Sequence, residues 1–253
     1  VFAYTVSTIT HPEENSSARL RSAAILLSIG MLAGATTQLY FKPDAEGLNA
    51  WLVWILLLTA FFHLPSFTSK DSLGRRASAD LSLKKWNRPG MGFFLKGGGR
   101  GTALFFLCLA LPLLLFVFFP SLEARDIKNG ALAPIATLLI ILAVTGLPAA
   151  LAASPKASPQ KQKLWRFLIL FSIPLLSLLA VLTGLLMGEV DAEHPLNAIG
   201  FIFGAFDPIH DEPSLSSGGV IFFGLFAIVG FLVGLKRIVR ALQETRSTKR
   251  AIR

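Results

Sequence analysis

Charged residues are missing from long parts of this chain of 253 residues. Only 15% of the residues are charged and 53% are hydrophobic, whereas a soluble domain of this length needs a charged surface. Six apolar stretches contain no Lys, Arg, Asp or Glu: Ala23–Phe41, Leu48–Pro65, Thr102–Pro120, Ala131–Ala153, Phe167–Met187 and Gly218–Leu235. As a helix rising about 1.5 Å per residue, each stretch can cross a hydrocarbon core of about 30 Å. The sequence therefore predicts an all-α integral membrane bundle of six transmembrane helices.

Cysteine and ionisable groups are equally scarce inside these stretches. The single cysteine, Cys108, excludes an intrachain disulfide and a cysteine-based metal site. His63 is the only His, Asp, Glu, Lys or Arg residue within any of the six stretches. Proton-coupled carriers, ion pumps and electron carriers need such groups at membrane depth, so the sequence argues against them. We interpret His63 as a hydrogen-bonded boundary residue, and we predict no cofactor and no enzymatic activity.

The charges between the stretches alternate in sign along the chain. Of the 24 basic residues, only Lys42, Arg125 and Lys128 fall on the side opposite both termini, and most of the 15 acidic residues lie there. The positive-inside rule then predicts that both termini are cytoplasmic. We divide the chain into a cytoplasmic N-terminal segment 1–22, a transmembrane domain 23–235 and a basic cytoplasmic tail 236–253. The net charge of +9 is explained by these flanking residues, and we expect no binding of nucleic acid.

Glycines four residues apart occur in the first and the sixth stretch. Gly30 and Gly34 share one helix face, as do Gly230 and Gly234, and such pairs allow close packing of membrane helices. We predict that these four glycines mediate helix packing, either within one subunit or between two. The other glycine-rich segment, Lys96–Thr102, lacks the order of residues of a phosphate-binding loop, and we interpret it as a flexible linker.

The segment between the fifth and sixth stretches has an apolar part, Pro195–Phe206, that is too short to cross a membrane. We predict that it forms a short re-entrant or interfacial segment. Acidic and histidine residues surround it, and they fit either a divalent metal site or, as we prefer, a solvated acidic loop. These residues are Asp191, Glu193, His194, Asp207, His210 and Asp211.

The order of these features resembles the six-helix membrane subunits of ATP-binding-cassette exporters. The shared features are two inner termini, a basic loop after the second helix and a short segment between the fifth and sixth helices. In that family the loop after the second helix carries a coupling helix that docks on the ATPase, and the matching region here is Ser78–Arg88. The resemblance assigns the docking role to Leu81, Leu83, Lys84, Lys85, Trp86 and Arg88. Val1–Arg21 departs from the family because Pro12 interrupts the expected N-terminal interfacial helix.

The resemblance implies the permease subunit of an ATP-driven exporter, which conducts substrate while a separate ATPase supplies energy. The alternative is a non-catalytic scaffold subunit of a larger membrane complex, which an apolar bundle with few polar groups suits equally. A half-sized carrier is a third, weaker interpretation. The expected partners are membrane lipid, a cytoplasmic ATPase or other membrane subunits, and further copies of the chain. The charge bias between the loops suits a bacterial inner membrane.

Overall fold

The computed structural model describes residues 17–41, 45–70, 94, 97–113, 124–154, 156–187, 197–204 and 216–252. These residues form α-helices and no strands. The helices are α2 (Ser17–Phe41), α3 (Ala45–Phe67), α5 (Gly98–Leu113), α7 (Ala124–Ala152), α8 (Pro159–Met187), α9 (Ala198–Gly204) and α10 (Ser217–Ile252). Each of the six apolar stretches coincides with one long helix, although the last residues of the third stretch lie outside the described part. The prediction of an all-helical bundle is confirmed.

Four of the helices are long and apolar enough to cross a membrane. The qualifying segments are Ala50–Phe67, Leu132–Ala152, Pro159–Thr183 and Ser217–Ser247. The apolar parts of α2 and α5 are shorter as described, at Arg21–Thr37 and Gly98–Leu111. The chain therefore has the helices of a multi-pass membrane protein, and the count of six spans stays a prediction.

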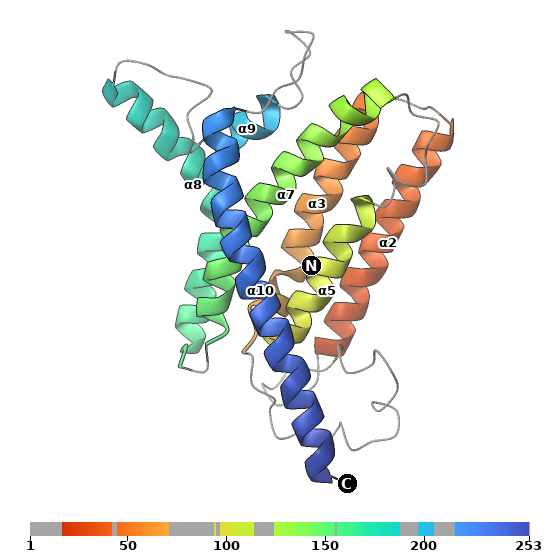
Figure 1. The fold of residues 1–253 in the computed structure, drawn as a ribbon, viewed down its shortest axis with the longest axis vertical. Helices are drawn as coiled ribbons and strands as arrows, with labels where there is room; N and C mark the ends of the chain where they lie inside the picture. Colours follow the sequence, from red (N-terminus) through yellow and green to blue (C-terminus); the bar gives the residue numbers. More distant parts are fainter. Residues whose placement is uncertain are drawn as a thin grey trace.

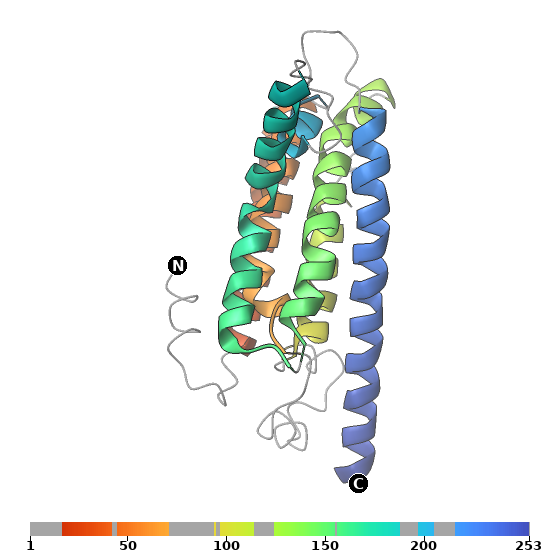
Figure 2. The same cartoon turned by 90° about the vertical axis from the view of Figure 1, so that its left-hand side faces the viewer.

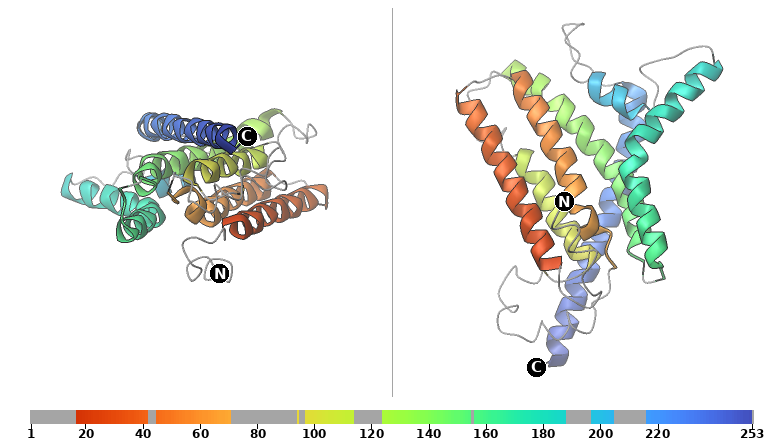
Figure 3. Two further views of the ribbon diagram at one scale, coloured as in Figure 1. Left: turned by 90° about the horizontal axis from the view of Figure 1, so that it is seen from below. Right: turned by 180° about the vertical axis from the view of Figure 1, so that it is seen from behind.

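The helices run up and down beside one another (Figure 1). Seen from below, α10 covers α5 and α7, which in turn cover α2, α3 and α8 (Figure 3). The most extensive contact is between α7 and α10, and α3 also packs on both α5 and α7. α10 is 36 residues long and extends past the other helices at one end (Figure 2). We call this the basic end: there α3, α7 and α10 terminate, and α2, α5 and α8 begin.

Buried side chains form two apolar clusters along the bundle. One lies around Phe105 and is shared mainly by α3, α5 and α7; its buried members include Leu56, Leu64, Phe67, Leu109 and Ile141. The other includes Val53, Ala136, Ile140, Phe201 and Phe223. Phe201 belongs to α9, so the short helix between the fifth and sixth predicted spans packs into the bundle rather than away from it. The backbone N–H of Ile199 also donates to Ser177 Oγ of α8 over 3.0 Å.

The outer faces of α8 and α10 are strongly apolar. Large exposed side chains include Leu182, Leu185 and Leu186 on α8 and Leu225 and Leu232 on α10. Soluble monomers seldom expose contiguous apolar patches of this extent, whereas hydrocarbon solvates them without cost. α8 bends along its length (Figure 3), and its internal Pro174 removes a helical hydrogen bond, which is a common cause of such a bend.

Glycines bring α7 and α10 into backbone contact. A Cβ on Gly146 of α7 would overlap the Cα of Gly230 of α10, and a Cβ on Gly230 would overlap the carbonyl oxygen of Leu142. Without a hydrophobic drive between helices in lipid, such close approach supplies much of the association energy. The α7–α10 contact therefore depends on these two glycines.

Gly230→Ala is expected to lower the free energy of unfolding of the protein in detergent by about 1–3 kcal/mol, because the new methyl group overpacks the α7–α10 contact. Gly224→Ala is the matched control: it lies on the same helix, and no heavy atom of the described residues lies within 4 Å of its Cβ position. Thermal unfolding of both variants checks the effect. Equal melting temperatures of the two variants would contradict the close backbone contact between Gly230 and α7.

Candidate functional site

The end of α3 supplies the acceptors around which a polar site is built. The last carbonyl groups of a helix have no intrahelical partner and need donors from elsewhere. Here the Thr68 N–H donates to Leu64 O over 3.1 Å, and the Ser69 hydroxyl donates to Ser66 O over 2.8 Å. Arg237 of α10 donates from Nη2 to Phe67 O over 2.7 Å. A guanidinium at this position also interacts favourably with the negative end of the helix dipole.

Arg21 of α2 reaches the same place from the other side of the bundle. It is fully buried, and it donates from Nε to Ser66 Oγ over 2.7 Å and from Nη2 to Gly97 O over 2.8 Å. Gly97 has a φ of 146°, a conformation that side chains disfavour. Arg21 lies two residues before the charge-free stretch Ala23–Phe41. Burial, and secondly the charge of Arg100, lower the pKa of its guanidinium to about 9.

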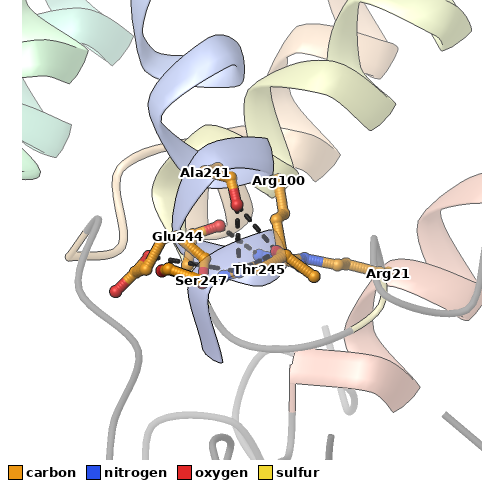
Figure 4. A network of polar contacts seen from close by, with 7 residues as sticks. Arg21, Arg100, Ala241, Glu244, Thr245 and Ser247 are labelled. Atoms are coloured by element: carbon orange, nitrogen blue, oxygen red, sulfur yellow. Dashed lines mark hydrogen bonds and ion pairs between the residues drawn. The ribbon is translucent and has the colours of Figure 1, made fainter. Parts of the chain in front are cut away.

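Arg100 joins α5 to α10. Its Nη2 donates to Thr245 Oγ1 over 2.6 Å and to Ala241 O over 3.3 Å, and it lies 4.0 Å from a carboxylate oxygen of Glu244. Figure 4 shows Arg100 against this turn of α10, with Arg21 extending from α2 toward it. The ion pair is long and Glu244 is partly exposed, so the hydrogen bonds hold Arg100 more firmly than the ion pair does.

Arg166 completes what we call the arginine cluster: Arg21, Arg100, Arg166 and Arg237. Its Nε donates to Thr68 Oγ1 over 2.8 Å, just past the end of α3. Guanidinium groups from α2, α8 and α10 thus meet residues 66–68, and Arg100 adds a bond between α5 and α10. The cluster ties five helices together at the basic end.

The glycine-rich segment before the third predicted span is part of this site. The prediction of a flexible linker is wrong for Gly98–Thr102, which forms the first turn of α5. A Cβ on Gly99 would overlap the carbonyl oxygen of Arg237, and a Cβ on Gly101 would overlap the carbonyl oxygen of Ser66. The glycines therefore allow α5 to start in close contact with both α10 and the end of α3.

In the sequence, the predicted docking residues lie between Lys70 and Gly97, which both belong to the surroundings of the arginine cluster. Leu81, Leu83, Lys84, Lys85, Trp86 and Arg88 fall outside the described residues. The chain on either side is described, and the Gly98 N–H donates to Lys70 O over 3.0 Å. Lys70 and Gly98, which flank segment 71–97, are thus held together next to the arginine cluster.

His63 differs from its interpretation as a hydrogen-bonded boundary residue. The side chain is fully buried in α3, and among the described residues neither Nδ1 nor Nε2 has a hydrogen-bond partner. Its ring lies 6.2 Å from that of Phe105. Its position one turn before the end of α3 agrees with a boundary residue, but the expected hydrogen bond is absent among the described residues, where the apolar ring of Phe105 of α5 lies beside the imidazole.

The predicted packing glycines fall into two groups. Gly230 contacts α7, and a Cβ on Gly234 would overlap the ring of Phe106 of α5. Gly30 and Gly34 have no heavy atom within 4 Å of their Cβ positions in the described part of the chain, so their role in packing stays a prediction.

The acidic and histidine residues around Pro195–Phe206 lie outside the described residues. Within the residues that are described, no group of three His, Cys, Asp or Glu side chains could hold a metal ion.

The arginine cluster can donate charge-assisted hydrogen bonds in fixed directions. Such bonds suit a role in holding the ends of helices or in joining one helix end to another.

Sequence reasoning placed all four arginines among flanking loop residues and missed that Arg21, Arg100 and Arg237 are buried and that Arg166 is partly buried. One feature of the sequence pointed to them. Each arginine lies within two residues of an apolar stretch, where lysine, whose charge is more strongly hydrated, would suit a solvated position better.

A scan against protein-family models and searches of curated proteins and of solved structures found no match to this chain.

Arg237→Ala is expected to destabilise the protein by about 1.5–3 kcal/mol, because it removes a charged donor and leaves Phe67 O without it. Arg240→Ala is the matched control, one turn further along α10 and exposed. Thermal unfolding in detergent measures both. If Arg240→Ala lowered the free energy of unfolding as much as Arg237→Ala does, the role assigned to the hydrogen bond from Arg237 to Phe67 O would be refuted.

Proposed function

We propose that this chain is the permease subunit of an ATP-driven exporter, working as a dimer with a separate cytoplasmic ATPase. The observation that supports the proposal is the hydrogen bond between Lys70 and Gly98, the residues on either side of segment 71–97, beside the arginine cluster. A partner that moves this segment acts on Lys70 and Gly97, and Arg21 joins Gly97 to α2 and to Ser66. Force that reaches Lys70 or Gly97 thus passes to α2, α3 and α5 through short hydrogen bonds.

The same arrangement supports a cytoplasmic location for the basic end. Arg21, Arg100, Arg166 and Arg237 all lie there, together with the basic residues of the α10 extension. Arginine and lysine are retained on the cytoplasmic side during insertion. Both termini are then inside, α9 lies near the outer surface, and a bacterial inner membrane is the proposed location.

A scaffold subunit is the second candidate, and the dense packing of the bundle favours it. α7 and α10 meet through glycine backbones. A cavity of about 140 Å³, lined only by apolar side chains, is smaller than the roughly 300–1,000 Å³ of ordinary small-molecule sites. Its lining residues are Phe106, Leu109, Ala110, Leu138, Leu142 and Phe231.

The proposed orientation predicts opposite labelling of the two ends of α10. Ser217 and Ser247 are both exposed, near the two ends of this helix. In a Cys108→Ala background, Ser217→Cys is expected to react with a membrane-impermeant maleimide in intact spheroplasts, and Ser247→Cys only after permeabilisation. The reverse pattern, or reaction of both in intact spheroplasts, would overturn the orientation.

The exporter proposal predicts that tagged protein co-purifies with an ATPase whose hydrolysis depends on the docking residues. Leu83→Asp with Trp86→Asp is expected to uncouple hydrolysis from transport, and Lys163→Asp, on the same side but in the exposed start of α8, is the charge control. Transport and ATPase assays of the reconstituted complex measure this. Recovery of other membrane subunits without any ATPase would instead support the scaffold, and a folded monomer without partners would contradict both.

A further inference from the structure

Two polar side chains on one face of α3 have no hydrogen-bond partner among the described residues. Thr59 and His63 lie one helical turn apart, and both are fully buried. Thr59 Oγ1 and both ring nitrogens of His63 lack a hydrogen-bond partner among the described residues. In an apolar interior, each such group costs on the order of 1–3 kcal/mol when nothing satisfies it. Three unsatisfied atoms within one turn therefore need an explanation.

The hydroxyl of Thr59 differs from comparable hydroxyls in the same bundle. Thr102, Thr137 and Thr145 are buried helical threonines, and each donates to the carbonyl oxygen four residues earlier, over 2.9, 2.8 and 2.6 Å. A helical threonine reaches that acceptor by choosing one of two χ1 rotamers. Thr59 makes no such bond, so its hydroxyl is not satisfied by its own helix as the other three are.

The surroundings of this pair restrict what can satisfy it. Phe105 of α5 covers His63, and Ser66, at the next turn of α3, is already occupied by Arg21. The nearby guanidinium groups disfavour a cation. A bulky ligand is disfavoured by the packing of α3 against α5, where Leu56, Phe67, Phe105 and Leu109 form one buried cluster. A small neutral molecule that both donates and accepts hydrogen bonds remains.

We propose that Thr59 and His63 form a buried hydration site, in which water bridges the hydroxyl and the imidazole between α3 and α5. A neutral imidazole offers one donor and one acceptor, and a hydroxyl offers a donor and two acceptors. Buried water commonly makes about three hydrogen bonds to polar groups of this kind. The site lies one turn from the arginine cluster and is a polar interruption of an otherwise apolar helix contact. It does not depend on the exporter proposal.

Solid-state NMR of the full chain in lipid bilayers tests the site directly. With ¹⁵N-labelled histidine, magnetisation is transferred from water protons to the ring nitrogens, and loss of one signal in His63→Gln assigns His63. The expected result is transfer from water to His63 in the unmodified protein. A His63 ring signal without any water transfer would overturn the proposal, whatever the fate of the variants.

Thr59→Val separates a shared site from water bound to His63 alone. Valine keeps the shape of threonine and removes the hydroxyl, so water transfer to His63 is expected to be lost. Thr137→Val, whose hydroxyl bonds to its own helix in α7, should leave the transfer unchanged. Unchanged transfer in Thr59→Val would overturn the bridging role. Thermal stability gives a second readout: Thr59→Val should lower the melting temperature if water is bound, whereas an unchanged or raised value would indicate a dry, unsatisfied hydroxyl.

Discussion

The backbone acceptors at the end of α3 are the constraint on which the basic end of the bundle depends. A helix that ends near the membrane surface, covered by neighbours, cannot rely on water to satisfy its last carbonyl groups. Arg237 reaches Phe67 O from α10, and Arg21 and Arg166 bind the adjacent hydroxyls of Ser66 and Thr68. Arg237 satisfies a backbone acceptor, whereas the other two arginines bind side-chain hydroxyls, so residues 66–68 at the end of α3 are bonded to three other helices.

Close backbone contacts make these long reaches possible. Arg237 and Arg21 can both meet α3 because Gly99 and Gly101 let the start of α5 lie directly against α10 and α3. Further along, Gly146 and Gly230 hold α7 against α10 in the same way. Small residues and guanidinium groups therefore act together: glycine removes the side chain that would separate two helices, and arginine bridges the remaining polar groups.

The positions of the helices could be predicted from sequence because hydrocarbon allows few alternatives. Charge-free stretches such as Leu48–Pro65 and Ala131–Ala153 must form helices in lipid, and both do. The arginine cluster could not be predicted in this way, because a positive charge beside a span fits a solvated loop as well as a buried cap. Gly98–Thr102 was misread for a related reason: glycine permits both flexibility and close packing, and only the neighbours, here Ser66 and Arg237, decide between them.

Rigidity at the basic end also limits where the protein could change shape under the proposed function. Five helices are bonded together there, and α7 and α10 are joined along their length, so movement of segment 71–97 would displace this end as a unit. The opposite end is held differently. α8 bends away from the bundle, and its contact with α9 includes one bond from the Ile199 N–H to Ser177 Oγ. The α8–α9 contact lies at the end of the bundle opposite the arginine cluster, so under the proposed function it is where an exporter and a static scaffold are expected to differ most.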